Sequence, residues 1–412
     1  MATNKEQNKL NVPHLRFPEF HGEWEKCKLG DIATLTKGSG ISKDQRSATG
    51  TPCILYGELY TTYKSEVINY VVSKTDISDK NLVRSCANDI IIPSSGETAI
   101  DISTARCVLS PDVLLGGDLN IIRLKDGDGR FFSYQLNGVR KHDIAKIAQG
   151  VSVVHLYGES IKGLTVSFPS NKEQQKISTL LSLIDERIAT QSKLIEKLES
   201  LIKGMEDNLL DNPLWEKTYL RSFMQFFPTN SLSWEQLSYK EGAIRNLHYG
   251  LIHGLQTRGI NSASLPMIKN EAIPKQYTLC QVGDVAFADA SEDTGEIAKS
   301  VEFVDTIEGD TICGLHTIHG RDIKNRTVVG FKGFAFNSCY FHNQIKRLAQ
   351  GTKVFSITAN NLSSCYVYLP DLETQKAIVN LLKTYEAKLL VNKRLLEHYE
   401  KQKQYLLRQM FI

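Results

Sequence analysis

Residues 170–210 read SNKEQQKISTLLSLIDERIATQSKLIEKLESLIKGMEDNLL, and this stretch decides the plan of the whole chain. Its apolar residues recur at alternating steps of four and three, and only Gln191 interrupts the series. Such a heptad pattern is typical of a helix that buries one narrow stripe against another helix. The seam positions in the first part of the stretch are Ile177, Leu181, Ile184, Ile188, Gln191, Ile195 and Leu198.

The same pattern returns near the C-terminus, shifted by 201 residues (378 − 177). The shift also aligns Pro370 with Pro169 and Gln375 with Gln174. Surface helices of an ordinary α/β domain carry apolar stripes too, but a register of this length in both copies favours a pair of long helices. The corresponding seam positions are Ile378, Leu382, Tyr385, Leu389, Asn392, Leu396 and Tyr399.

Both patterns begin with helix-start signals directly after a proline. Ser170 and Glu173 have the spacing of a capping box, and Asp371 can cap the second helix through its carboxylate. We therefore expect long helices over 169–212 and 370–412, and an internal pseudo-two-fold repeat.

The composition is that of a soluble protein. The chain has 412 residues, 41% apolar and 23% charged, which is enough for two or three domains with real cores. No stretch reaches the roughly 18 apolar residues of a membrane span, and the first dozen residues lack an apolar signal region, so we expect a cytoplasmic protein. The eight cysteines include no Cys-x-x-Cys pair, so we expect buried, reduced thiols and no metal site.

Charge is balanced along the chain. Residues 1–170 contain 20 basic and 19 acidic residues, and residues 211–370 contain 15 of each. A strongly basic nucleic-acid-binding domain is therefore excluded. If the chain binds DNA, it does so through local patches or with the help of partner subunits.

The residues before the first long helix contain short strand-like runs separated by Gly, Asp, Asn and Ser, typical of a mixed domain. A helix is expected over 131–150, and a last strand over 161–169 leads into the first long helix. The runs are PCILYGEL, EVINYVV, DIIIPSS, RCVLS and NIIRL. The expected fold class is α+β, with two mixed, strand-rich globular domains separated by two long helices.

The second half follows the same order after a turn at 211–213. Trp234 corresponds loosely to Trp24, and a helix is expected over 339–351. The clearest match is AQGVSVVHL at 148–156 against AQGTKVFSI at 349–357, again shifted by 201. The repeat therefore includes part of each globular domain, although most of the two domains differ.

These features together resemble the specificity subunit of type I restriction-modification systems. The resemblance covers nearly the whole chain and depends on the domain–helix–domain–helix order, the duplicated AQG element, and FPSNKEQQKI and LPDLETQKAI at the helix starts. It implies two target-recognition domains on a spacer of two antiparallel helices. It also implies a DNA-sequence-recognition subunit that recruits two methyltransferase subunits and restriction subunits, with S-adenosylmethionine, ATP and Mg on those partners.

This organisation divides the chain into five segments. An N-terminal tail over 1–14 is expected to be flexible. Recognition domains then occupy 15–168 and 213–369, each followed by one long helix.

Two non-identical domains at a fixed separation can contact two half-sites about one DNA turn, roughly 34 Å, apart. Loop side chains would read base edges, while Lys, Arg, Ser and backbone amides would hold phosphates. The candidate DNA-binding residues are Lys37, Ser39, Lys43, Tyr56, Ser94, Ser95 and Ser152 in the first domain and Tyr249, His253, Arg258, Ser291 and Lys353 in the second.

Motifs for catalysis are lacking in the sequence. The stretch 211–214 (DNPL) lacks the second proline and the aromatic residue of an amino-methyltransferase loop, so we interpret it as a helix stop. We therefore expect a non-catalytic subunit. The alternative is a coiled-coil scaffold or inhibitor whose two domains bind protein, which copurification with a methyltransferase would exclude.

Gln191 and Asn392 occupy the same seam position in the two repeats (392 − 191 = 201). In an antiparallel pair both fall within one turn of the middle, so we expect their amides to meet. A polar residue in an apolar seam fixes register, because a slipped alignment leaves its amide unsatisfied.

Overall fold

The computed structural model describes residues 11–77, 81–255, 258–305, 307 and 309–412. The chain divides into two compact units, one made of the residues up to Ser192 together with Arg394–Ile412, the other of Lys193–Lys393. The two boundaries are themselves 201 residues apart (393 − 192), the shift of the sequence repeat. Each unit therefore contains one globular domain and one half of each long helix.

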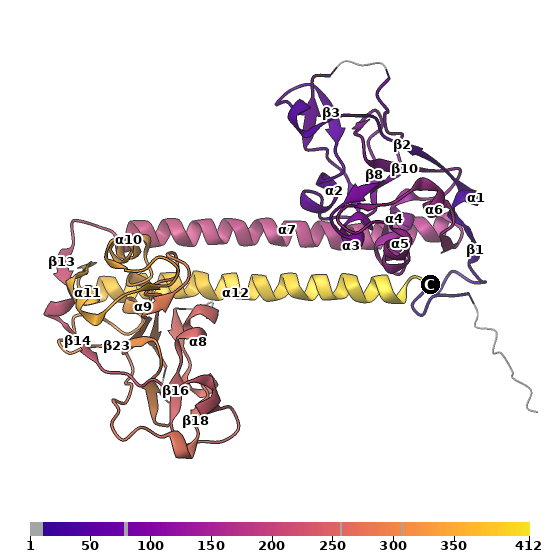
Figure 1. Cartoon of the computed structure of the whole chain (residues 1–412). Helices are drawn as coiled ribbons and strands as arrows, with labels where there is room; N and C mark the ends of the chain where they lie inside the picture. Colours follow the sequence, from indigo (N-terminus) through magenta and orange to yellow (C-terminus); the bar gives the residue numbers. More distant parts are fainter. Residues whose placement is uncertain (1–10, 78–80, 256–257, 306, 308) are drawn as a thin grey trace, which may run out of the picture. The chain divides into compact units, whose positions relative to one another are not determined.

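The two long helices are α7 (Asn171–Leu210) and α12 (Leu372–Gln409) (Figure 1). All the seam residues named above are buried or half-buried, whereas Leu183, Leu201 and Val391, which lie off the seam, are exposed. The narrow apolar stripe expected from the heptad pattern is thus present on both helices, and the predicted fold class is confirmed.

Contacts within each unit show that the helices are antiparallel. In the first unit, Lys403 Nζ lies 2.6 Å from Asp185 Oδ1, and the Arg187 guanidinium lies 6.0 Å from the centre of the Tyr399 ring. In the second unit, Lys393 Nζ lies 2.7 Å from Glu199 Oε1. Residue numbers on one helix rise as those on the other fall, so the direction implied by the family resemblance is correct.

A glutamine at the start of each long helix holds the neighbouring domain. Gln174 accepts a hydrogen bond from the Asp128 amide (3.0 Å) and donates one to the Pro169 carbonyl (2.8 Å). Gln375 accepts from the Val328 amide (3.0 Å) and donates to the Pro370 carbonyl (3.0 Å). Both side chains are buried, so the equivalence of the two glutamines extends from sequence to hydrogen bonding.

The predicted helix caps have different outcomes. Asp371 caps α12 as expected, because its carboxylate accepts from the Thr374 amide at 2.9 Å. The capping box at Ser170 is wrong in its second half. Glu173 is committed to Arg16, whose guanidinium donates two hydrogen bonds of 2.8 Å to its carboxylate.

The first domain is built on a five-stranded mixed sheet. Its strand order is β2-β10-β6-β8-β4, in which only the β4–β8 pair is parallel. The strands span Ala33–Lys37 (β2), Leu119–Leu124 (β10), Asp89–Pro93 (β6), Arg106–Val108 (β8) and Val67–Ile68 (β4). A smaller sheet contains β5 (Ser73–Thr75), β3 (Thr51–Ile54) and β9 (Leu114–Leu115). All five strand-like runs expected from the sequence contain strands.

The second domain repeats this sheet in the order β14-β23-β19-β21-β17, again with its last pair parallel. The strands span Met224–Phe227 (β14), Thr317–Asp322 (β23), Val285–Ala288 (β19), Ser300–Phe303 (β21) and Gly259–Ile260 (β17). A four-stranded sheet contains β15 (Leu237–Ser238), β18 (Met267–Ile268), β16 (Arg245–Leu247) and β22 (Thr311–Cys313). The two domains share one fold despite their different sequences.

The equivalence of Trp24 with Trp234 is wrong. Trp24 precedes β1 (Glu25–Lys28), which pairs with β12 (Thr165–Phe168) just before α7. The matching pair in the second unit is β13 (Glu216–Tyr219) with β25 (Tyr366–Leu369), and the residue before β13 is Trp215. The equivalent sequences are therefore Trp-Glu-Lys at 24–26 and at 215–217.

Two other expectations need correction. The helix expected over 131–150 is two helices, α4 (Gly129–Asn137) and α5 (Lys141–Ile147), which are separated at Gly138, where the backbone leaves the helical conformation (ψ −107°). At the end of α4, the Asn137 side chain exchanges two hydrogen bonds with the Ala105 backbone. The helix expected over 339–351 is α10 (Cys339–Leu348), which ends three residues earlier because Gln350 pairs with Ser356. Of the tail expected over 1–14, residues 1–10 lie outside the described residues, and Asn11 exchanges two hydrogen bonds with the Trp24 backbone.

Each domain packs over a carboxylate on the long helix that follows it, buried in the first unit and half-buried in the second. In the first unit this residue is Asp185, which accepts hydrogen bonds from Tyr134 Oη (2.8 Å) and Ser65 Oγ (2.7 Å) besides the ion pair with Lys403. The equivalent residue in the second unit is Glu386 (386 − 185 = 201). Both units therefore have a carboxylate at the same position of the repeat, on the long helix that follows the globular domain.

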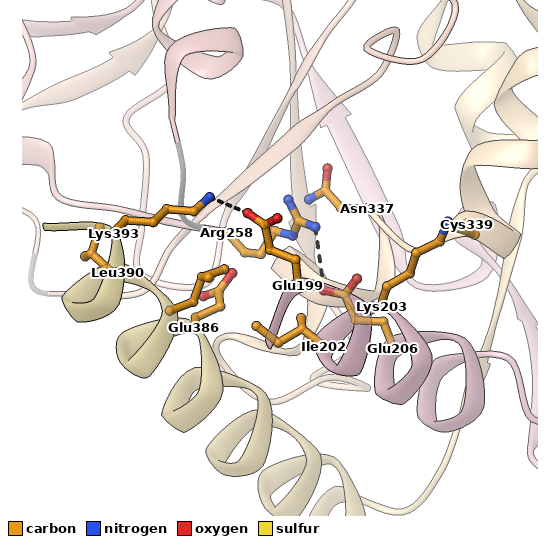
Figure 2. A pocket seen from close by; sticks show the side chains of 11 residues that line it. Glu199, Ile202, Lys203, Glu206, Arg258, Asn337, Cys339, Glu386, Leu390 and Lys393 are labelled. Atoms are coloured by element: carbon orange, nitrogen blue, oxygen red, sulfur yellow. Dashed lines mark ion pairs between the residues drawn. The ribbon is translucent and has the colours of Figure 1, made fainter. Parts of the chain in front are cut away.

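Glu386 lines a cavity of about 320 Å³ in the second unit, between the two helix halves and the domain (Figure 2). Arg258 points into this cavity and lies 3.5 Å from Glu206 on the other helix. Burial raises the pKa of Glu206, and burial raises the pKa of Glu386 to about 7 although Arg258 opposes this shift. Arg258 and Lys383 both favour the charged carboxylate of Glu386, but burial has the larger effect on its pKa.

We expect Glu386→Gln to flatten the pH dependence of stability. Because the folded-state pKa lies above the unfolded value, the Glu386 contribution is fully present at acidic pH and is lost as pH rises through about 7. Each unit of raised pKa corresponds to about 1.4 kcal/mol. The free energy of unfolding of the variant, relative to that of the native chain, should therefore rise by about 2 kcal/mol when the pH is raised from about 5 to about 8. Urea unfolding at both pH values measures this, with the exposed Glu373→Gln as control. If both variants gained the same stability relative to the native chain on this rise in pH, the raised pKa of Glu386 would be contradicted.

The central polar pair gives a second prediction. Gln191 is buried, and Asn392 donates to the Lys388 carbonyl at 2.7 Å, but the two residues belong to different units, so their meeting stays a prediction. Replacing both by leucine should keep or raise the melting temperature while allowing other helix registers or oligomers. Crosslinking of cysteine pairs along the seam, together with light scattering, would detect this. A single unchanged register would count against the idea.

Candidate nucleic-acid interface

The AQG elements form the same closed loop in both domains. In the first, β11 (Val154–His155) pairs with β7 (Ser95–Gly96), and Gln149 exchanges two backbone hydrogen bonds with His155. In the second, β24 (Phe355–Ser356) pairs with β20 (Ala290–Ser291), and Gln350 exchanges the same two bonds with Ser356. We call these the tip loops, residues 150–153 and 351–354.

A glycine begins each tip loop because the backbone is left-handed there. Gly150 has φ +121° and Gly351 has φ +130°. A Cβ at either position would lie about 2 Å from the carbonyl oxygen three residues later. The loop geometry is therefore fixed by backbone and glycine alone, and the side chains between remain free to contact a ligand.

The tip-loop side chains face solvent. Val151 is 97% exposed, and Ser152, Val153, Lys353 and Val354 are also exposed. Exposed valines beside a hydroxyl or an ammonium can contact thymine methyl groups, base edges or phosphates. Of the residues predicted from sequence, Ser152 and Lys353 thus lie at equivalent, accessible places.

Other first-domain candidates are less accessible. Ser94 is buried, with its hydroxyl 3.4 Å from Asp118, and the Ser39 hydroxyl accepts from the Val83 amide at 2.7 Å. Ser95 is half-buried on β7, and Lys37 is exposed at the end of β2. Lys37 and Ser95 are therefore the more accessible of these candidates, because Ser94 is buried and the half-buried Ser39 hydroxyl is used in the Val83 hydrogen bond.

Lys43 and Tyr56 line a large hollow of about 1060 Å³ in the first domain. Arg46 lines it too and lies 3.6 Å from Glu58. The sequence reasoning missed Arg46, although its place three residues after Lys43 was an available signal. Lysine, arginine and tyrosine around one hollow can contact phosphate, sugar and an unstacked base.

In the second domain, Tyr249 and His253 belong to α8 (Tyr249–Gly254), with ring centres 6.0 Å apart. Tyr249 also contacts His248 (4.7 Å) and His316 (5.2 Å), and His248 lies against Trp234 (4.4 Å). This row of rings, 45% exposed at Trp234, can stack on bases or donate hydrogen bonds.

The sequence reasoning missed Trp234, His248 and His316 in this row. The stretch HYGLIH at 248–253, in which a histidine adjoins Tyr249, was the available signal for one of these rings, His248. Burial lowers the pKa of His248, and the neighbouring His316 lowers it further, so both effects favour the neutral imidazole. Its Nδ1 accepts from the Gly250 amide at 3.2 Å, which leaves Nε2 as the donor.

The remaining candidates have different surroundings. Ser291 is half-buried on β20, beside the second tip loop, since it pairs with Phe355. Arg258 lies in the cavity with Glu206 and Glu386 described above, so its guanidinium is committed to the helices. The stretch 211–214 is a turn at the end of α7, where Asn212 caps the Leu214 amide at 3.0 Å, as expected for a helix stop.

Among the residues that the structure describes, no helix is both long and apolar enough to span a membrane.

Known proteins match this chain along almost its whole length. The type I restriction enzyme MjaVIII specificity subunit of Methanocaldococcus jannaschii is 24% identical, over 98% of this chain and 95% of its own. The putative type I restriction enzyme MjaX specificity subunit of the same organism is 25% identical, over 97% of this chain and 94% of its own.

Solved structures share the fold. The S subunit of a type I restriction-modification system from M. genitalium gives a TM-score of 0.62 at 17% identity, covering 97% of this chain and 99% of that one. A chain from a structure of type I R-M complex assembly and conformational transition gives 0.54 at 13% identity, covering 94% and 97%. Residues 21–200 and 311–400 match the family model described as the type I restriction modification DNA specificity domain. Because these segments are well over half of the sequence, the chain belongs to that family of DNA specificity domains.

Proposed function

We propose that this chain is the DNA-recognition subunit of a type I restriction-modification complex, in which each globular domain reads one half of a bipartite, asymmetric site. The observation that carries the proposal is that the chain contains two domains of the same fold with different side chains on their exposed loops. Both domains have the same sheet order, the same glutamine anchor and the same tip loop. After the shared glycine, the tip loops differ at two of their three positions, with Val151 and Ser152 in the first domain and Thr352 and Lys353 in the second, while Val153 and Val354 are the same residue type. Two different half-sites require such differences.

The long helices supply the spacer in this proposal. α7 and α12 contain 40 and 38 residues and each continues through the boundary between the units. At about 1.5 Å per residue each helix is roughly 60 Å long. In this proposal, the register of the two helices would set the number of base pairs between the half-sites.

The nearly neutral charge of both domains indicates that this chain does not hold DNA alone. Neutralising phosphates with Lys and Arg supplies most of the non-specific affinity for DNA, and neither domain has an excess of basic residues. Two methyltransferase subunits and restriction subunits would supply the remaining contacts and the chemistry. S-adenosylmethionine, ATP and Mg would bind to those partners, while this cytoplasmic chain selects the sequence and catalyses nothing itself.

Exchanging residues 15–168 for the same segment of a relative should change one half of the methylated site and leave the other half and the spacing unchanged. The reason is that each domain has its own core and its own tip loop. Mapping methylated adenines in a host that carries the methyltransferase subunits measures the outcome. The matched experiment exchanges 213–369 and should change only the other half. A swap that altered both halves, or a native chain that directed no methylation, would refute the proposal.

The isolated chain should bind duplex DNA weakly, with a Kd in the micromolar range or above at about 150 mM salt. Addition of the methyltransferase subunits should tighten binding at least 100-fold and make it sequence-specific. Fluorescence anisotropy with a duplex containing the mapped site, and with a scrambled duplex of equal length, measures both quantities. Nanomolar, salt-sensitive binding by the chain alone would contradict the charge argument.

A further inference from the structure

Three side chains with metal-binding atoms meet inside the second domain, away from the tip loop. Cys280 precedes β19, Cys313 ends β22 and His319 lies on β23. All three are buried, and their ligand atoms lie within 4.8 Å of one another. Their spacing in sequence gives no metal motif, because 32 residues separate the two cysteines and three different segments supply the ligands.

A carboxylate orients the histidine of this group. His319 Nε2 lies 2.7 Å from Asp284 Oδ2, and Asp284 is held by two bonds from the Arg321 guanidinium, of 2.8 and 2.7 Å. The carboxylate keeps the imidazole proton on Nε2, so the lone pair of Nδ1 is the one available to a cation. Histidines that bind metals commonly have such a carboxylate partner, which fixes their tautomer and their ring orientation.

The two sulfurs have the separation that zinc requires. Cys280 Sγ and Cys313 Sγ are 3.6 Å apart. Two Zn–S bonds of about 2.3 Å at a tetrahedral angle place their sulfurs about 3.8 Å apart. Two thiolates and Zn²⁺ together are neutral, which lowers the cost of charge in a buried place. Binding would release the two thiol protons to solvent.

A fourth ligand has access to this place. Cys313 and His319 both line a cavity of about 380 Å³, which is also lined by the polar residues Thr229, Asn230 and Gln276. A water molecule in this cavity would complete a tetrahedron with three protein ligands. We propose that Cys280, Cys313 and His319 bind one zinc ion, with Asp284 as the residue that positions the imidazole.

The site would fasten three segments of the second domain to one another. The Cys280 backbone already donates to the Thr311 carbonyl (2.8 Å), so the turn before β19 lies beside β22. Zinc would add bonds from both to β23. Its effect would be on the stability of this domain, independently of any DNA that the domain reads.

The test uses the untagged full chain, purified with a thiol reductant and with the exposed Cys86 and Cys339 replaced by serine. Plasma mass spectrometry should find one zinc per chain. Cobalt should replace zinc and give thiolate-to-cobalt absorption in the near ultraviolet. Cys280→Ser and Cys313→Ser should each lose the zinc and at least half of that absorption, whereas Cys365→Ser, at a buried cysteine elsewhere in this unit, should keep both.

Asp284→Asn leaves all three ligands in place, so it tests positioning apart from coordination. It should weaken zinc binding about 10- to 100-fold in competition with a chelator. If circular dichroism shows that a cysteine variant is unfolded, zinc binding by the native chain and by Asp284→Asn tests the proposal. The proposal would be overturned if the native chain took up neither zinc nor cobalt, or if the Cys313→Ser variant kept its zinc. It would also be overturned if a Cys280–Cys313 disulfide persisted in the presence of the thiol reductant.

Discussion

Burial of one narrow apolar stripe along each long helix is the constraint on which the rest of this molecule depends. The stripe is narrow but runs along the helix, so a second helix that packs lengthwise against it is needed to bury it. In the first unit the same core contains Ile177, Leu181, Leu406 and Met410 together with Trp24 and the aromatic residues of α4. Because seam and domain share one core, each domain is attached to its helix by packing as well as by hydrogen bonds.

Polar groups then fix where each domain sits on its helix. Gln174 and Gln375 bind backbone groups of the domain and of the preceding proline, and both are fully enclosed. Losing one such buried partner costs about 1–3 kcal/mol. Asp185 and Glu386 each lie about three helical turns after the glutamine (185 − 174 = 386 − 375 = 11). Asp185 is paired with Lys403 and Tyr134, whereas burial raises the pKa of Glu386.

Periodicity and internal repetition made the long helices, their polar exceptions and the repeated AQG element predictable, although the helices before this element were expected to run through it. The common fold of the two domains was not predictable, because most of their strands have only two to five residues and carry too little pattern. The wrong equivalence of Trp24 with Trp234 shows the same limit. It depended on approximate position alone, whereas Trp-Glu-Lys is identical at 24–26 and 215–217. Ser94 and Arg258 show another limit, since residue type cannot separate an exposed side chain from one that is buried, as Ser94 is, or paired with a buried carboxylate, as Arg258 is.

The tip loops have a consequence for how such a protein changes over time. Their shape comes from backbone bonds across Gln149 and His155 and from one left-handed glycine, so the three residues that follow the glycine contribute little to folding stability. Substitutions there can accumulate with almost no thermodynamic penalty, while the glycine itself is nearly immutable. A lineage carrying this scaffold can therefore explore new ligand preferences by point mutation, without the compensating changes that a core substitution would demand.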